Sequence, residues 1–405
     1  MHDASALLPI DQALQIVLRH AQLLAVETIK LSDAGGRVLA QAICADRDQP
    51  PFDRCAMDGV ALATDAPTAG QPWQLVGTAA AGAPFAGGLS AGQCVRIYTG
   101  AQVPADAVAV VPVERIRVAG AQVVVEDAAR AGQHIARKGS EVRAGATVVA
   151  AGTTLNAATL GVAAAFGHAT VAVARRPNVA ILPTGDEIVA VDAVPGPGQI
   201  RDSNRYQLAE IARRAGADVL HCAKAGDRRD LLEASLRAAL AVADVVVTCG
   251  GVSAGDLDLV APVLADLGAV AHFHKIRIKP GKPLLFATVG DKIVVGLPGN
   301  PVSAAVCAAL FLVPLLAAMQ GAQQTAWKIL PMPLAADLGP AGPRDEIVPL
   351  QWAHHGAAAA VAPITMVGSA DVFAFSRAQL LAIRPADHPA MAAGDLIDVL
   401  LWPLP

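Results

Sequence analysis

Apolar runs alternate with helical segments between residues 177 and 320, and this alternation restricts the fold more than any other feature of the chain. The runs VAIL, DVLHCA and DVVVTC are separated by the helical segments SNRYQLAEIARRAG (203–216) and RDLLEASLRAAL (229–240). Alternating units of this length predict a doubly wound parallel α/β domain. Ligands of such sheets bind at the carboxyl ends of the strands. We therefore expect the loops that follow the runs to lie together at one edge.

Those loops carry acids and amides, as TGDE (184–187), RDSN (201–204), AGD (225–227) and GGVSAGDLD (250–258). Glycines let backbone N–H groups approach a phosphate, and neighbouring carboxylates can hold a cation, so the combination suits a nucleotide phosphate with Mg²⁺. Each loop also has a plainer interpretation. A glycine-rich βα turn can be structural only, and ordinary helix capping is the better explanation of DSN taken alone.

A basic segment, KIRIKPGKP (275–283), follows in the same region. If it is one strand, its alternation places Lys275, Arg277 and Lys279 on one face. The strand is expected to end at Pro280-Gly281, near the acidic edge, where Lys279 and Lys282 can bind an oxyanion. The alternative is a solvated basic edge strand, whose lysines discourage pairing with another sheet.

Two loops outside the α/β region have a similar character. PPFDRCAMDGVAL (50–62) combines two prolines with two acids, and RIYTGAQVPADA (96–107) places Thr99 directly after a strand. A stiff loop that carries acids is typical of a functional segment. Short Val and Ile runs between about 70 and 125 predict a small β-rich domain, and short strands beyond about 327 predict a C-terminal β domain. The His-x-His at 272 and 274 has no third ligand in view and is better explained as a satisfied pair on a strand.

Composition excludes several classes of function. With 405 residues the chain should form two to four domains, and a net charge of −4 gives no electrostatic reason to bind nucleic acid or an anionic membrane. The six cysteines have no CxxC spacing and the N-terminus has no basic and apolar signal regions, which together predict a cytoplasmic protein with reduced thiols. The uncharged segment 302–319 is at the edge of transmembrane length, but Pro314 interrupts it and no basic flank follows. It is better explained as a helix that starts at Asn300-Pro301 and is buried against a sheet or a partner subunit.

Seven motifs occur together and in order: PPFDRCAMDGVA, RIYTGAQVP, TGDEI, IRDSNRYQL, TCGGVSAGDLD, IKPGKP and GLPGNPVS. By these motifs the chain resembles the molybdopterin molybdenumtransferase family, which includes the E domain of gephyrin, over essentially its whole length. The resemblance implies an α/β plus β fold in an elongated, L-shaped chain of four domains. These are a helical/linker domain (1–45 and 142–175), a β-rich domain (46–141), a central doubly wound α/β domain (176–326) and a C-terminal β-barrel-like domain (327–405).

The resemblance also implies an activity, because the family inserts molybdenum from molybdate into adenylylated molybdopterin, with Mg²⁺ and release of AMP. It implies a homodimer whose site joins the α/β domain of one subunit to the β domain of the other, and contacts with other proteins of molybdenum cofactor biosynthesis. Carried over by motif, the catalytic residues are Asp58, Thr99, Glu187, Asp227 and Asp258, and the metal ligands are Asp58, Glu141, Glu187, Asp227 and Asp258. The residues that would hold the pterin nucleotide and molybdate are Asp202, Ser203, Asn204, Gly250, Gly251, Ser253, Gly255, Lys279, Lys282, Pro298, Pro301, Ser303, Arg344 and Ser369.

The chain departs from the family pattern at two places. Arg54-Cys55 stands where the family usually has Asn-Ser or Asn-Thr, and Glu141 stands where it commonly has Asp. Glu keeps the charge on a longer arm, so we expect activity to be retained. The alternative function is a non-catalytic scaffold that binds molybdopterin, which loss of the acids would favour. A third possibility, a different nucleotide pyrophosphohydrolase, leaves KPGKP and the PPFD loop unexplained.

Overall fold

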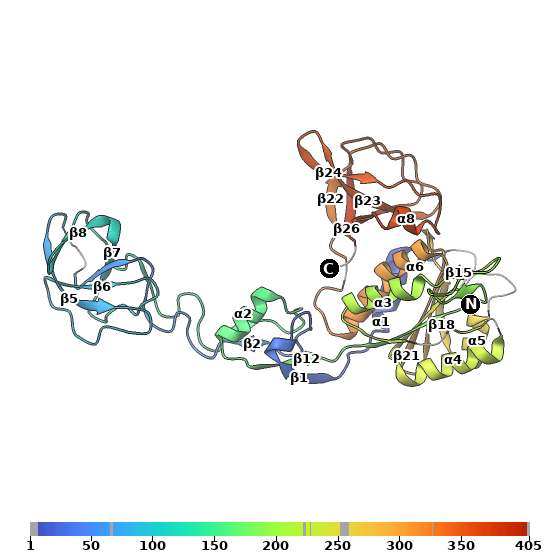
Figure 1. The fold of residues 1–405 in the computed structure, drawn as a ribbon, viewed down its shortest axis with the longest axis horizontal. Coiled ribbons are helices and arrows are strands. Elements are labelled where there is room, and N and C mark those ends of the chain that lie inside the picture. Colours follow the sequence, from blue (N-terminus) through green and yellow to red (C-terminus); the bar gives the residue numbers. More distant parts are fainter. Residues whose placement is uncertain are drawn as a thin grey trace.

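The computed structural model describes residues 7–64, 68–221, 224–226, 228–251, 259–325 and 327–402. Figure 1 shows a bent, elongated molecule with a β-rich part at one end, a narrow connecting part, and an α/β part beside a second β-rich part at the other end. The predicted fold class, α/β plus β in an elongated chain, is therefore confirmed.

The β domain occupies the far end of the arm in Figure 1. Its six-stranded sheet has the order β7-β4-β6-β5-β9-β8, and a separate pair joins β3 to β10. Alternate residues of its strands fill two cores, one on each face, because successive side chains of a strand point to opposite sides. The elements are β3 (Arg54–Cys55), β4 (Gly59–Leu62), β5 (Pro72–Ala79), β6 (Gln93–Ile97), β7 (Ala109–Pro112), η2 (Val113–Arg115), β8 (Ile116–Ala119), β9 (Gln122–Val125) and β10 (Ile135–Ala136).

The linker domain joins this arm to the rest of the molecule. Two antiparallel pairs, β1 with β12 and β2 with β11, surround the helix α2, whose N-cap Asn156 and Thr159 form a capping box. The elements are β1 (Val26–Lys30), η1 (Leu31–Asp33), β2 (Ile43–Cys44), β11 (Thr147–Val149), α2 (Ala157–Ala165) and β12 (Thr170–Ala174).

The α/β domain is built on a six-stranded sheet of order β16-β13-β17-β21-β20-β18. The first four strands are parallel, as the alternation predicts, but β20 runs in the opposite direction and pairs antiparallel with β21 on one side and with β18 on the other, so the sheet is mixed. The reason is the two-residue turn at Gly290-Asp291, which joins β20 to β21 as a hairpin. The strands are β13 (Asn178–Pro183), β16 (Asp218–His221), β17 (Val245–Cys249), β18 (Val270–Lys275), β20 (Pro283–Val289) and β21 (Lys292–Leu297), and a short parallel pair joins β14 (Ile188–Val189) to β15 (Ile200–Arg201).

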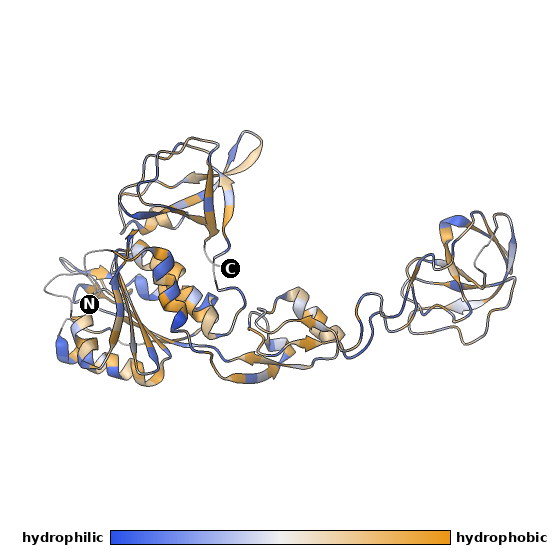
Figure 2. Cartoon of the chain, turned by 180° about the vertical axis from the view of Figure 1, so that it is seen from behind, coloured by the Kyte–Doolittle hydropathy of each residue, from blue (hydrophilic) through white to orange (hydrophobic). Residues whose placement is uncertain are grey.

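Helices cover both faces of this sheet. One face packs against α4 and α5, and the other against α3, α1 and the long helix that starts at Pro301. Figure 2 shows apolar residues concentrated along the central strands and mixed colours on the helices, as expected for helices with one buried side. The helices are α1 (Ile10–Arg19), α3 (Asn204–Arg214), α4 (Arg229–Val242) and α5 (Val260–Asp266).

Helix α1 corrects the predicted domain division. Residues 1–45 were assigned to the linker domain, but Ile10, Leu14 and Val17 are buried in the core between the sheet and the long helix. An amphipathic helix is stable where its apolar side is buried, and the α/β domain offers that surface. The first helix of the chain therefore belongs to the α/β domain.

The apolar segment predicted to be a buried helix is one. It runs through α6 (Pro301–Cys307), the π-helical η3 (Ala308–Leu312) and α7 (Val313–Met319). Among the described residues it is the helix that has the length and composition to cross a membrane, yet 83% of its most apolar window is buried within the structure. The π-helical stretch directly precedes α7, whose second residue, Pro314, cannot donate a regular helical hydrogen bond.

The C-terminal domain is built on the third six-stranded sheet of the described residues, of order β19-β23-β25-β26-β22 with β24 beside β23; β19 is Ile278–Lys279. A bridge between Leu334 and Val361 brings the ribbon of β24 back beside the end of β22, which partly closes the sheet. The elements are β22 (Leu330–Pro333), β23 (Asp345–His355), β24 (Ala358–Pro363), α8 (Val372–Phe375), β25 (Leu380–Arg384) and β26 (Leu396–Leu401).

The strand β19 (Ile278–Lys279) corrects a second prediction. The basic segment was expected to be one strand of the α/β sheet, but β18 ends at Lys275 and β19 pairs in parallel with β23 of the C-terminal domain. The segment thus ties the two domains together, and an ion pair between Arg277 and Asp345, 3.3 Å apart, lies at the same junction.

Candidate functional site

Three parallel strands of the α/β sheet end side by side. Pro183 of β13 lies beside Cys249 of β17, which lies beside Leu297 of β21. The loops that leave these three strands therefore converge at the carboxyl edge, where α/β sheets bind their ligands. This is the edge predicted from the alternation of strands and helices.

A pocket of about 330 Å³ lies at this edge. Several predicted ligand-holding residues line it together. Thr184, Arg201, Gly299 and Asn300, which belong to the same motifs but were not among the predicted site residues, line it as well. The predicted residues in the lining are Glu187, Asp202, Ser203, Asn204, Gly250, Pro298 and Pro301.

Gly250 explains why the apolar run of β17 ends in glycine. Its φ is +95°, a conformation that L side chains rarely adopt, and a Cβ there would lie 2.9 Å from both the carbonyl oxygen and the hydroxyl of Thr184. The Thr184 hydroxyl itself donates to the Cys249 carbonyl at 3.2 Å. The glycine thus allows two strand ends to approach closely beside the pocket.

Asn204 links the first turn of α3 to the loop after β21. Its Nδ2 donates to the carbonyl of Gly299 at 2.6 Å and to Cys249 Sγ at 3.0 Å. Its Oδ1 is buried and has no hydrogen-bond partner among the described residues. A buried acceptor without a partner is costly, so a ligand that donates a hydrogen bond here would be favoured.

Asp202 is used by its own helix. Its Oδ1 accepts the backbone N–H of Arg205 at 3.0 Å, and its Oδ2 forms an ion pair with the Arg205 side chain at 2.9 Å. The capping interpretation of DSN is therefore correct for Asp202, although the residue still lines the pocket.

Burial keeps the nearby thiol neutral. Cys249 is buried, which raises its pKa to about 12, and the hydrogen bond from Asn204 only partly offsets this. Cys249 Sγ donates to the Pro298 carbonyl at 3.3 Å. The thiol therefore holds the loop in place and is not a nucleophile at neutral pH.

The C-terminal domain reaches the same edge. Asn300 Nδ2 donates to Ser369 Oγ at 2.8 Å, and the backbone N–H of Val302 donates to the Ser369 carbonyl at 3.1 Å. Ser369 therefore lies against the start of α6, beside the pocket residue Asn300. The predicted Asn300 N-cap is confirmed in position, but its side chain bonds Ser369 and does not cap the helix.

The two predicted oxyanion lysines differ in their surroundings. Lys279 Nζ lies 3.2 Å from Glu346, a carboxylate that also pairs with Arg384. Burial alone would raise the pKa of Glu346, but Arg384 and Lys279 lower it, so Glu346 stays charged. Lys282 is exposed and no ion pair or side-chain hydrogen bond involves it within the described chain.

Ser303 and Arg344 border the turn that carries these lysines. Ser303 is buried in α6, and Gly281 packs so closely on this helix that a Cβ would lie 2.5 Å from Cys307 Sγ. Arg344 donates to the carbonyl of Ile278 at 3.2 Å. The turn at 280–281 is therefore held firmly between α6 and the C-terminal domain.

A second group of predicted residues lies in the β domain. Asp58 Oδ1 accepts the backbone N–H of Thr99 at 2.7 Å and its hydroxyl at 2.8 Å. These hydrogen bonds lower the pKa of Asp58, so this exposed carboxylate is ionised at neutral pH. Glu141 pairs with Arg54 at 2.8 Å.

The structure does not bring the two groups together within one chain. Asp58, Thr99 and Glu141 lie in or beside the β domain at the end of the arm, whereas the pocket lies in the α/β domain at the other end of the molecule (Figure 1). The predicted residues Asp227, Ser253, Gly255 and Asp258 lie outside the described residues. Gly251, the last described residue before Ser253, has a φ of +62°.

The donor chemistry at the pocket suits Mg²⁺, but the described residues do not complete a ligand set. Magnesium prefers oxygen ligands, and the pocket offers the Glu187 carboxylate and the Thr184 hydroxyl, whereas Asp202 is paired with Arg205. Over the described ranges, no three His, Cys, Asp or Glu side chains come together as a metal site. In the His-x-His, His272 packs on His20 in a tilted arrangement, with ring centroids 3.8 Å apart, and its Nε2 is hydrogen-bonded to the Thr288 hydroxyl at 3.0 Å, so His272 is a satisfied residue of β18.

Comparisons with known proteins agree with the fold. Residues 8–167 match the model "MoeA N-terminal region (domain I and II)", and residues 180–318 match "Probable molybdopterin binding domain". A molybdopterin molybdenumtransferase of Nostoc sp. is 35% identical over 73% of this chain and 70% of its own, and one of Bacillus subtilis is 30% identical over 97% of this chain and 94% of its own. The crystal structure of a molybdopterin biosynthesis moeA protein from Pyrococcus horikoshii is 25% identical, with a TM-score of 0.85 over 98% of this chain and 100% of that chain.

Proposed function

Because the chain belongs to the molybdopterin molybdenumtransferase family, and is therefore a transferase of molybdenum cofactor biosynthesis, we propose that it transfers molybdenum from molybdate to adenylylated molybdopterin, with Mg²⁺ and release of AMP. The observation that carries this proposal is the pocket where β13, β17 and β21 end, lined by seven of the residues that the motifs selected. Its volume of about 330 Å³ is in the range of small-molecule sites.

The pterin nucleotide is the ligand that we assign to this pocket. Gly250 and Gly251 let the backbone approach a phosphate, and Ser203 and Asn204 offer hydroxyl and amide groups at the start of α3. The unsatisfied Oδ1 of Asn204 would accept a hydrogen bond from a ring N–H or a ribose hydroxyl. Ser253 and Gly255 belong to the same proposed cradle.

We assign the oxyanion to the junction of the α/β and C-terminal domains. Lys282 offers an exposed ammonium group. Lys279 offers a second one, which forms an ion pair with Glu346. Ser303, Arg344 and Ser369 surround the same junction. Molybdate is a dianion, and charge-assisted hydrogen bonds from such groups are the contacts that hold small oxyanions.

Mg²⁺ would be held by Glu187, Asp227 and Asp258, with Asp58 and Glu141 completing the acidic set. When bound, the ion neutralises phosphate charge and stabilises charge that develops at the pyrophosphate linkage. The chain's own contribution is to keep these acids ionised and correctly oriented. The hydrogen bonds from Thr99 do this for Asp58, because they lower its pKa.

The separation of Asp58 from the pocket supports the proposal of a homodimer. The arm carries Asp58 and Thr99 away from its own α/β domain, so a second subunit has to supply them if they act at the pocket. Assembly around a two-fold axis would create two such composite sites. We expect this enzyme in the cytoplasm, together with other proteins of molybdenum cofactor biosynthesis, since the described cysteines are all free thiols.

The direct test is incubation of the protein with adenylylated molybdopterin, molybdate and Mg²⁺. The proposal expects AMP and active cofactor to appear together and both to require the divalent cation. The alternative function, a non-catalytic scaffold, expects the pterin nucleotide to bind and no AMP to form. AMP formation without cofactor would identify a hydrolase and overturn the proposal.

A further inference from the structure

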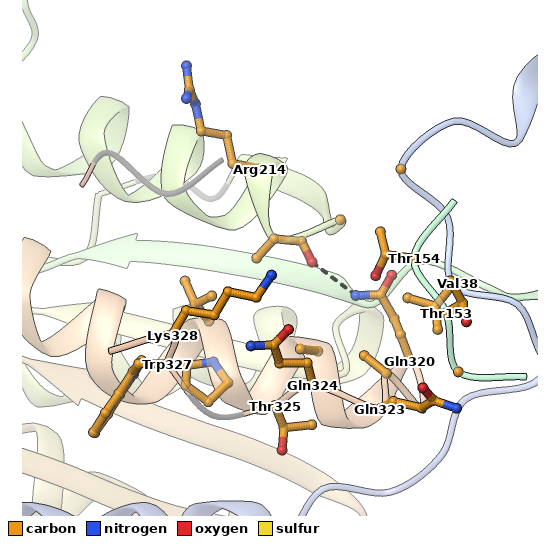
Figure 3. Close-up of a pocket in the computed structure, with 18 of the residues that line it drawn as sticks. Val38, Thr153, Thr154, Arg214, Gln320, Gln323, Gln324, Thr325, Trp327 and Lys328 are labelled. Carbon is orange, nitrogen blue, oxygen red and sulfur yellow. Dashed lines mark hydrogen bonds between the residues drawn. The ribbon is translucent and has the colours of Figure 1, made fainter. Parts of the chain in front are cut away.

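A second and larger cavity lies at the root of the arm, away from the proposed catalytic pocket. Its volume is about 670 Å³, and none of the residues selected from the sequence lines it. Figure 3 shows it between the ends of α3 and α7 and the linker domain, with Thr153, Thr154 and Val38 on the linker side. Leu400 and Leu401 add a contribution from the C-terminal domain.

The cavity borders the contacts that attach the arm. Gln323 donates from its backbone N–H to the Gly152 carbonyl at 2.9 Å and from Nε2 to the Ala151 carbonyl at 2.8 Å. Gln320 is buried, and its Nε2 donates to the Ala215 carbonyl at 2.9 Å, the bond drawn in Figure 3. The segment that follows α7 therefore fixes the linker domain to the α/β domain, and the cavity is lined by both attachment points.

The chemistry of the walls selects a class of ligand. The lining contains no Asp or Glu, and it contains the ammonium group of Lys328 and the amides of Gln320, Gln323 and Gln324. Lys328 is exposed and extends into the view of Figure 3, whereas Arg214 points away and bonds Glu210. Val313, Pro314 and Ala317 form an apolar floor.

Trp327 contributes its indole to the cavity wall, where the ring packs against the main core. Its Nε1 is buried and donates to no acceptor within the described chain.

We propose that this cavity binds a small organic anion, whose carboxylate, sulfonate or phosphate group contacts Lys328 while its apolar body lies on α7. The ligand touches the linker, α/β and C-terminal domains at once, so it binds only when they have the arrangement seen here. By linkage, the bound anion stabilises that arrangement and fixes the direction of the arm. This site is independent of the proposed catalytic function.

The test uses two matched fluorescent probes with the full-length protein. The anionic probe is 8-anilinonaphthalene-1-sulfonate, and the neutral one is N-phenyl-1-naphthylamine, which has the same rings without the charge. Lys328→Gln should lower the affinity for the anionic probe about three- to tenfold, which is the usual effect of losing one charged contact at a partly exposed site. The affinity for the neutral probe should stay nearly unchanged. Lys30→Gln, which removes an exposed lysine from β1 outside the cavity, is the control and should change neither affinity.

Filling the cavity tests its location. Ala317→Phe should displace both probes, and the anionic probe should slow amide hydrogen exchange at residues 319–323 in the wild-type chain only. Unchanged binding of the anionic probe to Ala317→Phe would place it elsewhere and overturn the proposal. Equal weakening of both probes by Lys328→Gln would overturn the preference for an anion. Probe affinity and hydrogen exchange do not depend on turnover. A failure of this proposal can therefore be distinguished from a failure of the proposed catalytic function.

Discussion

The guanidinium group of Arg54 lies 2.8 Å from the Glu141 carboxylate, which joins the two positions where this chain departs from the pattern of its family. A second ion pair links the same two segments. The Asp53 carboxylate accepts hydrogen bonds from the Arg137 guanidinium at 2.5 Å and from the backbone N–H of Lys138 at 2.9 Å. Burial alone would raise the pKa of Asp53, but these two donors lower it. The loop that carries Asp58 is thus fixed to the segment that carries Glu141.

The first prediction is that Arg54 acts through Glu141. Arg54→Gln should lower the rate of molybdenum insertion about tenfold, which is the usual effect of losing a side chain that orients a metal ligand. The double variant Arg54→Gln/Glu141→Gln should be no slower than Glu141→Gln alone, because Glu141 is then no longer there to orient. Steady-state rates at saturating Mg²⁺ test this. If the two effects multiply, the residues act independently and the positioning role is wrong.

The second prediction concerns the composite site. Asp58→Asn and Glu187→Gln should each be inactive as pure dimers. After subunit exchange of an equal mixture, half of the dimers carry one variant of each kind and one intact site, so about a quarter of the sites should recover activity. Native mass spectrometry verifies the exchange. Full exchange without recovery would locate the site within a single chain.

The third prediction separates the two lysines. Lys282 has no ion-pair partner within the described chain, so Lys282→Ala should raise the molybdate concentration required for half-maximal insertion about tenfold, the effect of one charge-assisted contact. Affinity for the pterin nucleotide should change little. Lys279→Ala should also leave Glu346 with Arg384 as its remaining partner, and therefore affect stability as well.

The control for this prediction is Lys275→Ala, which removes an exposed lysine at the end of β18. It should alter neither quantity. An equal loss of affinity for molybdate and for the pterin nucleotide in Lys282→Ala would assign this lysine to the phosphates.

The fourth prediction concerns stability and pH. Asp244 is largely buried. It accepts hydrogen bonds from the two terminal nitrogens of the Arg175 guanidinium, at 2.7 and 2.8 Å, and from the backbone N–H of Asn178 at 2.8 Å. Burial alone would raise the pKa of Asp244, but these donors lower it below the ordinary value of 3.8. Asp244→Asn should reduce the free energy of unfolding by about 2 kcal/mol at neutral pH.

The sign of the pH effect follows from the lowered pKa. The stabilisation by Asp244 is fully present above pH 3.8 and is lost as the pH falls through the pKa of the folded state. The difference in urea stability between wild type and Asp244→Asn should therefore be largest near neutral pH and shrink below about pH 4. Asp230→Asn, which breaks an exposed pair with Arg228, is the control and should have little effect at any pH. A difference that stays constant down to pH 3 would contradict the assignment.

The sequence predicts those parts of the molecule that depend on local pattern. The alternation of strands and helices located β13, β17 and their loops, and Gly250 is where a turn needs a positive φ. Contacts between distant segments were not predictable in this way. The pairing of β19 with β23, and the bond between Asp58 and Thr99, join residues that no local period relates. Antiparallel β20 has a local signal in the sequence, the Gly290-Asp291 turn.

The candidate site shows the same division. Motifs selected Asn204 and Gly250, and both line the pocket, whereas Thr184 and Asn300 were missed as pocket residues because their role depends on which strand ends lie side by side. Asp202 shows the opposite case. Its type and spacing suit a ligand contact, but its oxygens are occupied by the start of α3.

The buried helix Pro301–Met319 has a consequence for how the protein is made. A ribosome releases the chain from its N-terminus, so the strands β13, β16, β17 and β21 and the helices α1 and α3 are all synthesised before this helix appears. The part of its cover that these elements form is therefore already available when its apolar side chains leave the exit tunnel, whereas its contacts with α8 form later. A circular permutation that placed residues 301–319 first would expose the same segment to chaperones and membranes with no partner to cover it, and we expect that such a chain would aggregate during translation although its folded structure is unchanged.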